Sequence, residues 1–403
     1  MPVTLRDVRA AARRNASGII RTPCPESIPL GEITGCRIFC KLDNFQRTGS
    51  FKERGARNAL LRLPPARQKC GVIAASAGNH ALGLTYHGRL LGIPVTVVMP
   101  TYAPLIKVST CRRLGATVIV HGASFADARA HADELAAREG YTYINGYDHP
   151  DVIAGQGTLG LEVLQQVPDL DAIIVPVGGG GLIAGVSLVV KTLRPRVRVI
   201  GVESKATASF AAAVRAGHPV STVARPTLAD GLAVAQVGAN AFALARDRVD
   251  RVVVVDEDLI SLAVLRMLEL EKTVVEGAAA APLAACLSGQ LPELRDHKVV
   301  LACSGGNIDP ATLGRVIERG LVADGRLCRF TVAISDRPGG LATLSTLIAS
   351  TGASIHDIVH DRAFSGPNVA AVNAVCTVET RDRAHIRALH RAIRVAGFAV
   401  RAS

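Results

Sequence analysis

The sequence predicts an α/β protein built on parallel sheets with helices on both faces, followed by a smaller C-terminal domain of a different kind. Up to residue 302, short apolar runs alternate with helical stretches, which is the order of a parallel sheet covered on both sides. From Cys328 the order becomes strand–helix–strand–strand–helix–strand, which is typical of a ferredoxin-like domain. A length of 403 residues with 49% hydrophobic and 20% charged residues fits a globular chain of two or three domains.

The spacing of apolar residues predicts the first elements. Residues 4–20 are expected to form an amphipathic helix. Strands are expected at 37–42, 71–75, 95–99 and 117–120, and helices at 79–91, 103–114 and 125–139. Ser124 and Asp127 stand where a capping box starts the last of these helices, with Asp in place of the usual Glu.

The alternation resumes after residue 171. Strands are expected at 173–177, 197–202, 251–255 and 299–302, and a helix at 182–190. The longest uncharged stretch, residues 172–190, approaches the length of a membrane span. Pro176 and four glycines interrupt it, so we expect a strand, a loop and a helix there and no membrane association.

The second domain is expected at residues 328–403, after a first domain at 1–320 and a linker at 321–327. Gly320 and Gly325 interrupt the helical pattern at this linker. In the second domain, strands are expected at 329–335, 354–359, 368–378 and 398–401, and helices at 341–350 and 382–395. A turn at Ser365-Gly366-Pro367 is expected between the middle two strands.

Lys52 is the most informative single residue. The chain has eight lysines against 38 arginines, so a lysine after the uncharged segment Thr48–Phe51 indicates a use for its amine. Unlike arginine, a lysine amine loses its proton when it is desolvated, and it then forms a Schiff base with a carbonyl. A surface lysine at a helix start is the simpler interpretation, and the spacing alone favours it.

Four glycines, Gly178 to Gly181, follow the apolar run at 172–177 and precede an apolar helix. A strand, a glycine loop and a helix N-terminus form an anion site, because free backbone N–H groups and the helix dipole attract a phosphate. Gly179-x-Gly181-x-x-Ala184, with Glu203 at the end of the next expected strand, also fits the dinucleotide-binding fingerprint. On this segment alone, a nicotinamide dehydrogenase is nearly as good an interpretation.

A third segment, residues 302–307, places Ser304 at the carboxyl end of another expected strand, where open α/β sheets bind ligands. A Schiff-base lysine, a phosphate-binding loop and a hydrogen-bonding group for a ring nitrogen are together what pyridoxal phosphate (PLP) needs from a protein. Lys52 and Ser304 therefore favour PLP over nicotinamide, because hydride transfer needs no Schiff-base lysine.

With these segments in this order, the sequence resembles the PLP-dependent serine/threonine dehydratases (threonine ammonia-lyases), which have the tryptophan-synthase-β fold, PLP fold type II. The resemblance covers nearly the whole chain and rests on seven separated motifs, at residues 44–52, 75–81, 153–158, 178–181, 229–231, 275–277 and 304–307. It implies a two-domain catalytic core at 1–320, in which a smaller domain near residues 50–150 is inserted into the larger.

Residues 328–403 resemble an ACT domain, a small amino-acid-sensing module. This resemblance implies a homo-oligomer and control by an amino acid such as isoleucine or valine, with Arg337–Leu341 as the candidate loop. A purely structural role in stabilising the oligomer is the alternative.

The first resemblance also implies the roles of the site residues. Lys52 is the catalytic residue, which carries PLP as a Schiff base and then removes the α-proton of the substrate. The residues implied to bind the cofactor ring, its hydroxyl, its nitrogen and its phosphate are Phe51, Lys52, Asn79, Gly178, Gly179, Gly180, Gly181, Leu182 and Ser304. The loop implied to bind the substrate carboxylate comprises Ser76, Ala77, Gly78, Asn79 and His80.

Simpler interpretations exist for several of these residues. Ser76 and Asn79 are residue types that usually cap the helix that follows them. His80 is equally explained as a structural histidine. Glu276 is either a charge at a helix start or a residue near the cofactor, and the sequence does not separate the two.

The implied reaction is the elimination of water from L-threonine or L-serine, which gives 2-oxobutyrate or pyruvate and ammonia. The alternatives are a serine racemase, a dehydratase of another 3-hydroxy amino acid such as 3-hydroxyaspartate, a β-replacement synthase and a non-catalytic amino-acid sensor. Racemases of this family carry a serine hydroxyl where this chain has Ala77, which argues against racemisation. Relatives with a divalent-cation site offer a carbonyl and a carboxylate where this chain has Thr207 and Ser209, so no metal is expected.

Composition bounds the partners and the compartment. The net charge of +12 permits anionic partners, but the basic residues are dispersed and aromatic residues make up only 3%, so no nucleic-acid partner is expected. Nine cysteines without a Cys-x-x-Cys pair argue for a reducing compartment and against a disulfide framework or structural zinc. The N-terminus lacks the apolar core of a signal peptide. These features predict a cytoplasmic protein that acts on a small amino acid.

Overall fold

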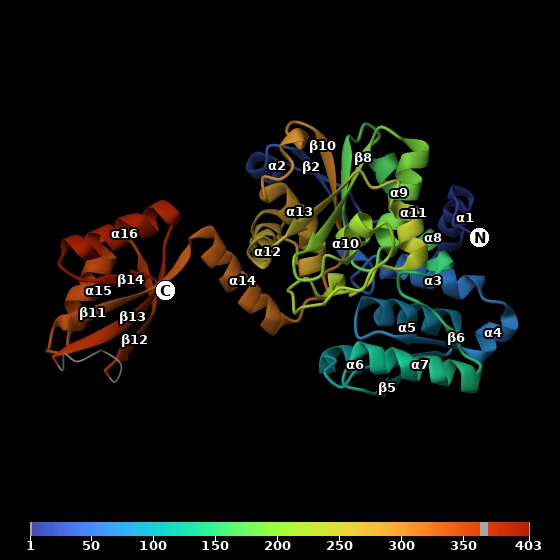
Figure 1. Cartoon of the computed structure of the whole chain (residues 1–403), viewed down its shortest axis with the longest axis horizontal. Helices are drawn as coiled ribbons and strands as arrows, with labels where there is room; N and C mark the ends of the chain where they lie inside the picture. The colour runs from blue at the N-terminus through green and yellow to red at the C-terminus, as the bar shows by residue number, and fades with distance from the viewer. Residues whose placement is uncertain (1, 363–369, 403) are drawn as a thin grey trace. The chain divides into compact units, whose positions relative to one another are not determined.

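The computed structural model of the chain describes residues 2–362 and 370–402 (Figure 1). The chain divides into two compact units, Met1–Asp309 and Pro310–Ser403. The first unit contains two parallel sheets, and the second contains an antiparallel sheet with a core of its own. This arrangement confirms the predicted fold class. Within the described residues, no helix combines the length and the apolar character that crossing a membrane requires.

The larger sheet of the first unit has six strands in the order β1-β2-β10-β7-β8-β9. They are β1 (Glu26–Ser27), β2 (Arg37–Leu42), β7 (Ala172–Pro176), β8 (Arg198–Ser204), β9 (Arg251–Val255) and β10 (Lys298–Cys303). Neighbouring strands are parallel, except that β1 runs antiparallel to β2. The five parallel strands lie where the sequence predicts them, to within two residues at each end.

The smaller sheet has four parallel strands in the order β5-β4-β3-β6. They are β3 (Val72–Ala75), β4 (Val95–Met99), β5 (Thr117–Val120) and β6 (Thr142–Tyr143). Strand β6 gives no sequence signal, because two residues are too few to show an alternating pattern.

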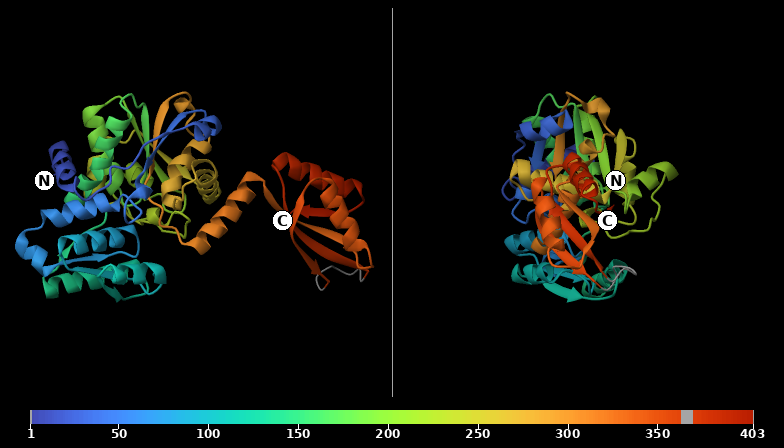
Figure 2. Two further views of the ribbon diagram at one scale, coloured as in Figure 1. Left: turned by 180° about the vertical axis from the view of Figure 1, so that it is seen from behind. Right: turned by 90° about the vertical axis from the view of Figure 1, so that its left-hand side faces the viewer.

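Helices cover both faces of the two parallel sheets (Figures 1 and 2). One face of the larger sheet packs against α1 (Leu5–Asn15), α8 (Pro150–Gln166), α9 (Gly181–Leu193), α10 (Ser209–Ala216) and α11 (Ala239–Ala245), and the other against α2 (Ile28–Thr34), α12 (Glu257–Glu271) and α13 (Gly277–Leu287). The smaller sheet packs against α3 (Lys52–Arg62), α5 (Asn79–Leu91) and α6 (Leu105–Arg113) on one face and α7 (Phe125–Glu139) on the other. The connections include α4 (Pro65–Cys70) and the short 3₁₀ helices Asp43–Phe45, Asp230–Leu232 and Pro292–Leu294.

Two helix termini show how local sequence sets these boundaries. Helix α7 begins with the predicted capping box, in which the Ser124 side chain accepts from the Asp127 N–H and the Asp127 side chain accepts from the Ser124 N–H. Helix α1 ends at Asn15, before its predicted end. A Cβ at Gly18 would lie 2.3 Å from Cζ of Arg57, so the chain turns here against the Arg57 side chain.

A buried network of four charged side chains joins α3 to the end of β2 and to α8. Lys41, Asp43 and Arg54 are fully buried, and Glu162 completes the network. Arg54 Nη2 donates to Asp43 Oδ1 at 2.8 Å and to Glu162 Oε2 at 2.9 Å, and Lys41 Nζ donates to Glu162 Oε2 at 2.6 Å. Burial acts to raise the pKa of Asp43, but the Arg54 guanidinium outweighs this effect and lowers it. The two positive and two negative charges of this network therefore balance in the interior. Its central member, Arg54, lies two residues after Lys52 in α3.

The second unit consists of α14 (Pro310–Asp324), β11 (Leu327–Ser335), α15 (Gly340–Ser350), β12 (Ser354–Asp361), β13 (Ala371–Glu379), α16 (Arg383–Val395) and β14 (Val400–Ala402). Its four strands form an antiparallel sheet in the order β12-β13-β11-β14. The predicted βαββαβ order is confirmed, whereas the turn predicted at 365–367 lies outside the described residues.

The end of helix α14 overlaps the predicted linker at 321–327. Helix α14 continues through Gly320 to Asp324, and the chain leaves the helix only at Gly325, which has a φ of +75°. A single glycine inside a helix costs only about 1 kcal/mol relative to alanine, which the rest of the helix offsets.

The buried network predicts the effect of Arg54→Met. The variant leaves Asp43 and Glu162 without their guanidinium, so the free energy of unfolding should fall by about 3–5 kcal/mol. Urea unfolding of the full chain followed by circular dichroism measures this change. Arg37→Met is the matched control, because Arg37 forms an exposed pair with Glu26 at 3.0 Å and should cost less than about 1 kcal/mol. Equal losses for the two variants would contradict the role of the network.

Candidate active site

The predicted site residues meet at the carboxyl ends of the parallel strands. The segment before Lys52 follows β2 and lies against the turn that follows β10. The Phe51 N–H donates to the Ser304 carbonyl at 2.9 Å, and Ser50 forms a β-bridge with Gly305. These backbone contacts hold Lys52 at the first position of α3.

The Lys52 side chain is half-buried, and its amine has one hydrogen-bond partner among the described residues. Nζ donates to the Gly146 carbonyl at 2.7 Å. Burial lowers the pKa of Lys52 to about 8, although the Glu276 carboxylate partly opposes this shift. An amine with this pKa is partly neutral near physiological pH, as a nucleophile or a proton acceptor must be. The Phe51 ring lies beside it, with its centroid 5.2 Å from Nζ.

The glycine loop lies between β7 and α9 and is packed closely. Gly180 has a φ of +92°, and a Cβ at Gly179 would lie 2.2 Å from Cγ of Tyr147. Within the described part of the chain, no group accepts from the backbone N–H groups of residues 178–182. The N-terminus of α9 therefore presents free donors, which is the chemistry of a phosphate site.

Asn79 does not cap its helix, because Gly78 is the N-cap residue of α5 and no side chain bonds to the first turn. Instead, Asn79 Nδ2 donates to Glu276 Oε1 at 2.8 Å, and Asn79 Oδ1 accepts from Asn307 Nδ2 at 2.8 Å. Burial raises the pKa of Glu276 to about 7, and the charge of Asp230 acts in the same direction. Glu276 is the N-cap residue of α13 and also lies beside Asn79, so the structure is compatible with both interpretations that the sequence left open.

The loop Ser76–Gly78 is half-buried between β3 and α5. Among the described residues, the one side-chain hydrogen bond of this loop is long, with the Gly78 N–H donating to Ser76 Oγ at 3.3 Å. His80 is buried, and its Nε2 lies 2.9 Å from the Ile144 carbonyl. Burial and the nearby Lys52 amine lower the pKa of His80 to about 3. The structure therefore favours the structural interpretation of His80.

These residues fit PLP. Lys52 supplies an amine with a lowered pKa, and residues 178–182 supply unpaired N–H groups. Ser304 is 1% exposed, and among the described residues no group bonds to its hydroxyl, which leaves that hydroxyl to meet a ring nitrogen. The donor set has the three parts that the sequence predicted for this cofactor.

The sequence interpretation missed the segment 145–148, which closes the site. Asn145 Oδ1 accepts from the N–H groups of Tyr147 and Asp148, at 2.9 and 2.8 Å, and so fixes a tight turn. This turn presents the Gly146 carbonyl to Lys52 and the Tyr147 ring to the glycine loop. The dipeptide Asn145-Gly146 is a turn signal, but nothing in it points to Lys52.

Glu203 has a structural role that removes it from the dinucleotide interpretation. Its two carboxylate oxygens accept from the N–H groups of Phe210 and Ala211, at 2.7 and 2.8 Å, at the start of α10. Burial raises the pKa of Glu203 to about 7, against the effect of these two bonds. Within the described residues, no three His, Cys, Asp or Glu side chains are grouped to hold a metal ion.

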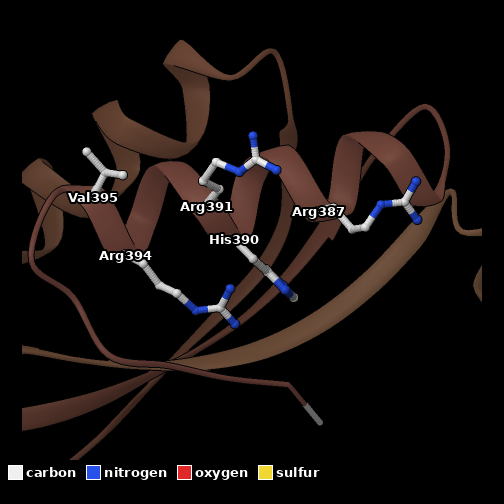
Figure 3. A pocket seen from close by; sticks show the side chains of 5 residues that line it. All are labelled: Arg387, His390, Arg391, Arg394 and Val395. Carbon is white, nitrogen blue, oxygen red and sulfur yellow. The ribbon is translucent and has the colours of Figure 1, made fainter.

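A hollow of ≈ 540 Å³ lies on α16 in the second unit (Figure 3). It is lined by Arg387, His390, Arg391, Arg394 and Val395. The arginine side chains spread away from one helix, and the His390 ring packs edge-on against Phe330. No lysine or carboxylate side chain lines this hollow, so it does not offer the chemistry of the site around Lys52.

Known proteins match this chain over most of its length. Residues 16–305 match the family described as pyridoxal-phosphate dependent enzyme. The chain is 40% identical over 399 residues to the L-threonine ammonia-lyase of Thermotoga maritima, with 99% of both chains covered. The processed threonine deaminase isoform 2 of Solanum lycopersicum is 35% identical, with a TM-score of 0.73 over 79% of this chain and 95% of that one. Maize serine racemase is 34% identical, with a TM-score of 0.75 over 80% and 99%.

The glycine loop predicts that Gly179→Ala weakens cofactor binding. The new methyl group would meet the base of the Tyr147 ring, which rotation of the ring cannot move away, so the loop must shift. We expect at least about a tenfold rise in the Kd for PLP, measured by fluorescence titration. Gly314→Ala is the control, since a Cβ there meets nothing within 4 Å, and it should leave the Kd unchanged. Unchanged PLP binding by both variants would contradict the role of the glycine loop in holding the phosphate.

Proposed function

The chain belongs to the pyridoxal-phosphate dependent enzymes, and on this premise we propose that it is a threonine/serine ammonia-lyase. The proposed reaction removes water from L-threonine, or L-serine, and releases ammonia with 2-oxobutyrate or pyruvate. The relatives named as threonine ammonia-lyase and threonine deaminase support this substrate class. The observation that carries the proposal is the half-buried Lys52 amine, which has a lowered pKa and lies among the groups that fit PLP.

Each site residue has a proposed task. When bound through Lys52, PLP supplies an electron-withdrawing ring that acidifies the α-hydrogen of the substrate. Lys52 Nζ accepts that proton, because its lowered pKa keeps the neutral amine populated. The N–H groups of residues 178–182 hold the phosphate, and Ser304 faces the ring nitrogen as a neutral hydroxyl. A hydroxyl does not protonate that nitrogen, which weakens the ring as an electron sink and favours loss of the β-hydroxyl group.

The substrate side of the site lies at the start of α5. We propose that the half-buried Ser76–His80 loop binds the substrate carboxylate through the N–H groups of Ala77, Asn79 and His80. The other two N–H groups are engaged within the chain, since that of Ser76 donates to the Val98 carbonyl at 3.1 Å and that of Gly78 to Ser76 Oγ at 3.3 Å. Asn79 is held in place by Glu276 and Asn307, and we assign it to the ring hydroxyl of the cofactor.

Racemisation is the main alternative, because maize serine racemase has the same fold. It requires a group on the opposite face of the cofactor that returns a proton to the α-carbon. The sequence places Ala77 where racemases carry that serine, and a methyl group has no proton to give. A non-catalytic sensor is disfavoured by the presence of Lys52, Asn79 and Ser304 together.

The second unit carries a further part of the proposal. We propose that it binds a small amino acid at Arg337–Leu341, which comprises the end of the loop after β11 and the start of α15, and that the enzyme is a cytoplasmic homo-oligomer. The βαββαβ order supports this role. An effect of isoleucine or valine on the rate or on the assembly would support control, and no effect would favour a role in oligomer stability alone.

The test is 2-oxo acid release from L-threonine and L-serine by the purified holoenzyme and its Lys52→Ala variant. We expect the variant to lose at least about 10³-fold in kcat, because it removes the proton acceptor and the point of cofactor attachment. Lys69→Ala, which removes an exposed lysine, should keep full activity. Full activity in Lys52→Ala would contradict the assignment, and D-serine formation faster than pyruvate release would favour the racemase.

A further inference from the structure

We propose that Glu53 and His87, a buried pair beside the active site, are positioning residues that hold the segment before Lys52 in register with helix α5. Neither residue belongs to the groups that fit the cofactor or the substrate. The inference rests on the proposed function, because it concerns how the Lys52 amine and Asn79 are placed relative to each other. It goes beyond that function in naming the contacts that set this placement.

The pair is fully enclosed. Glu53 follows Lys52 in α3, His87 lies in α5, and both side chains are 0% exposed. His87 Nε2 lies 2.9 Å from Glu53 Oε2. We assign Nε2 as the donor with Glu53 ionised, because an ionised carboxylate can only accept. The other carboxylate oxygen, Oε1, accepts the backbone N–H of Thr48. One carboxylate therefore joins α5 to the loop that leads into Lys52.

The same loop is joined to α5 a second time. The Thr48 carbonyl accepts from Asn307 Nδ2 at 2.6 Å, and this Nδ2 also donates to Asn79 Oδ1 at 2.8 Å. Asn79 is the first residue of α5, and His87 lies eight residues later, about 12 Å further along the axis at 1.5 Å per residue. A chain of hydrogen bonds thus connects His87 to Asn79 through Glu53, Thr48 and Asn307. Because His87 and Asn79 both lie in α5, this helix closes the loop of contacts.

A closed circuit with two attachment points constrains both the position and the rotation of α5. Between these points, α5 touches the first turn of α3. A Cβ at Gly83 would lie 3.3 Å from the backbone N of Glu53 and 3.3 Å from the carbonyl carbon of Lys52. Any shift of α5 is therefore transmitted directly to the backbone of Lys52.

Stability alone is a weak reason for such a pair. Two apolar side chains of similar volume fill a buried site without the desolvation that ionic groups suffer. What apolar side chains cannot supply is an acceptor for the Thr48 N–H, and a loop that loses this bond is free to move. The pair therefore has the features expected of a device that fixes geometry.

The test uses the holoenzyme of the double variant Glu53→Leu/His87→Leu, which removes both buried polar groups together and so avoids an unpaired charge. We expect a folded protein whose kcat for L-threonine is at least about tenfold lower, because misplacement of reacting groups slows the reaction. KM should change less than kcat. Without substrate, the visible absorption band of the cofactor should change in position or in its pH titration.

A second pair of variants keeps the test decisive if the double variant does not fold. His87→Gln retains a donor near the Nε2 position and should stay within about threefold of the wild-type kcat, whereas His87→Leu should show the full loss. His385→Leu is the matched control. His385 is a buried histidine of the second unit whose Nε2 lies 2.9 Å from the Thr351 carbonyl, and its loss should leave kcat and the absorption band unchanged.

Wild-type kcat, KM and absorption in a folded double variant would overturn the proposal and leave the pair a structural role. Equal values for His87→Gln and His87→Leu would do the same. The absorption band needs no substrate turnover, so it tests the pair even if the wild-type protein releases no 2-oxo acid. Failure of the proposed function and failure of this inference are therefore distinguishable.

Discussion

The site depends on the contact between two segments that are about 250 residues apart in sequence. The segment before Lys52 lies on the turn after β10, through the bond from the Phe51 N–H to the Ser304 carbonyl and the bridge between Ser50 and Gly305. Because these contacts are between backbone groups, the proximity of Lys52 and Ser304 does not depend on side-chain conformation. The glycine loop follows β7 of the larger sheet, whereas the loop before α5 follows β3 of the smaller sheet. The bond from Asn307 Nδ2 to Asn79 Oδ1 joins the start of α5 to the segment that follows β10.

Burial of charge near Lys52 is selective. The network of Lys41, Asp43, Arg54 and Glu162 balances its own charges and anchors α3 below the site. The Lys52 amine forms no ion pair among the described residues and donates to the neutral Gly146 carbonyl. Burial lowers its pKa by more than the nearby Glu276 carboxylate raises it. Helix α3 thus carries both Arg54, whose charge is stabilised by buried carboxylates, and Lys52, whose amine is made reactive by burial.

The sequence predicted the elements whose signals are local. The strands follow from apolar runs, and the start of α7 follows from Ser124 and Asp127. The family resemblance then drew Lys52, Asn79 and Ser304 into one predicted site. In the structure, the Phe51 N–H donates to the Ser304 carbonyl, and Asn79 bonds to Asn307, three residues after Ser304.

The missed features are those that depend on tertiary contacts. Gly146 acts through its carbonyl, which every residue has, and His87 acts through a partner 34 residues away. Helix α14 continues past Gly320 to Asp324, because a glycine weakens a helix without ending it. Such contacts leave no trace in the spacing of residues, so only the folded chain reveals them.

The central claim is that Lys52, among eight lysines, binds the cofactor. Reduction of the PLP-loaded protein with borohydride fixes the cofactor to the amine that holds it, and peptide mass spectrometry then locates the modified residue. The account predicts one phosphopyridoxyl group per chain, on Lys52, in the peptide that contains Ser50 and Phe51. Modification of a different lysine, or a protein that retains no cofactor after reduction, would contradict it.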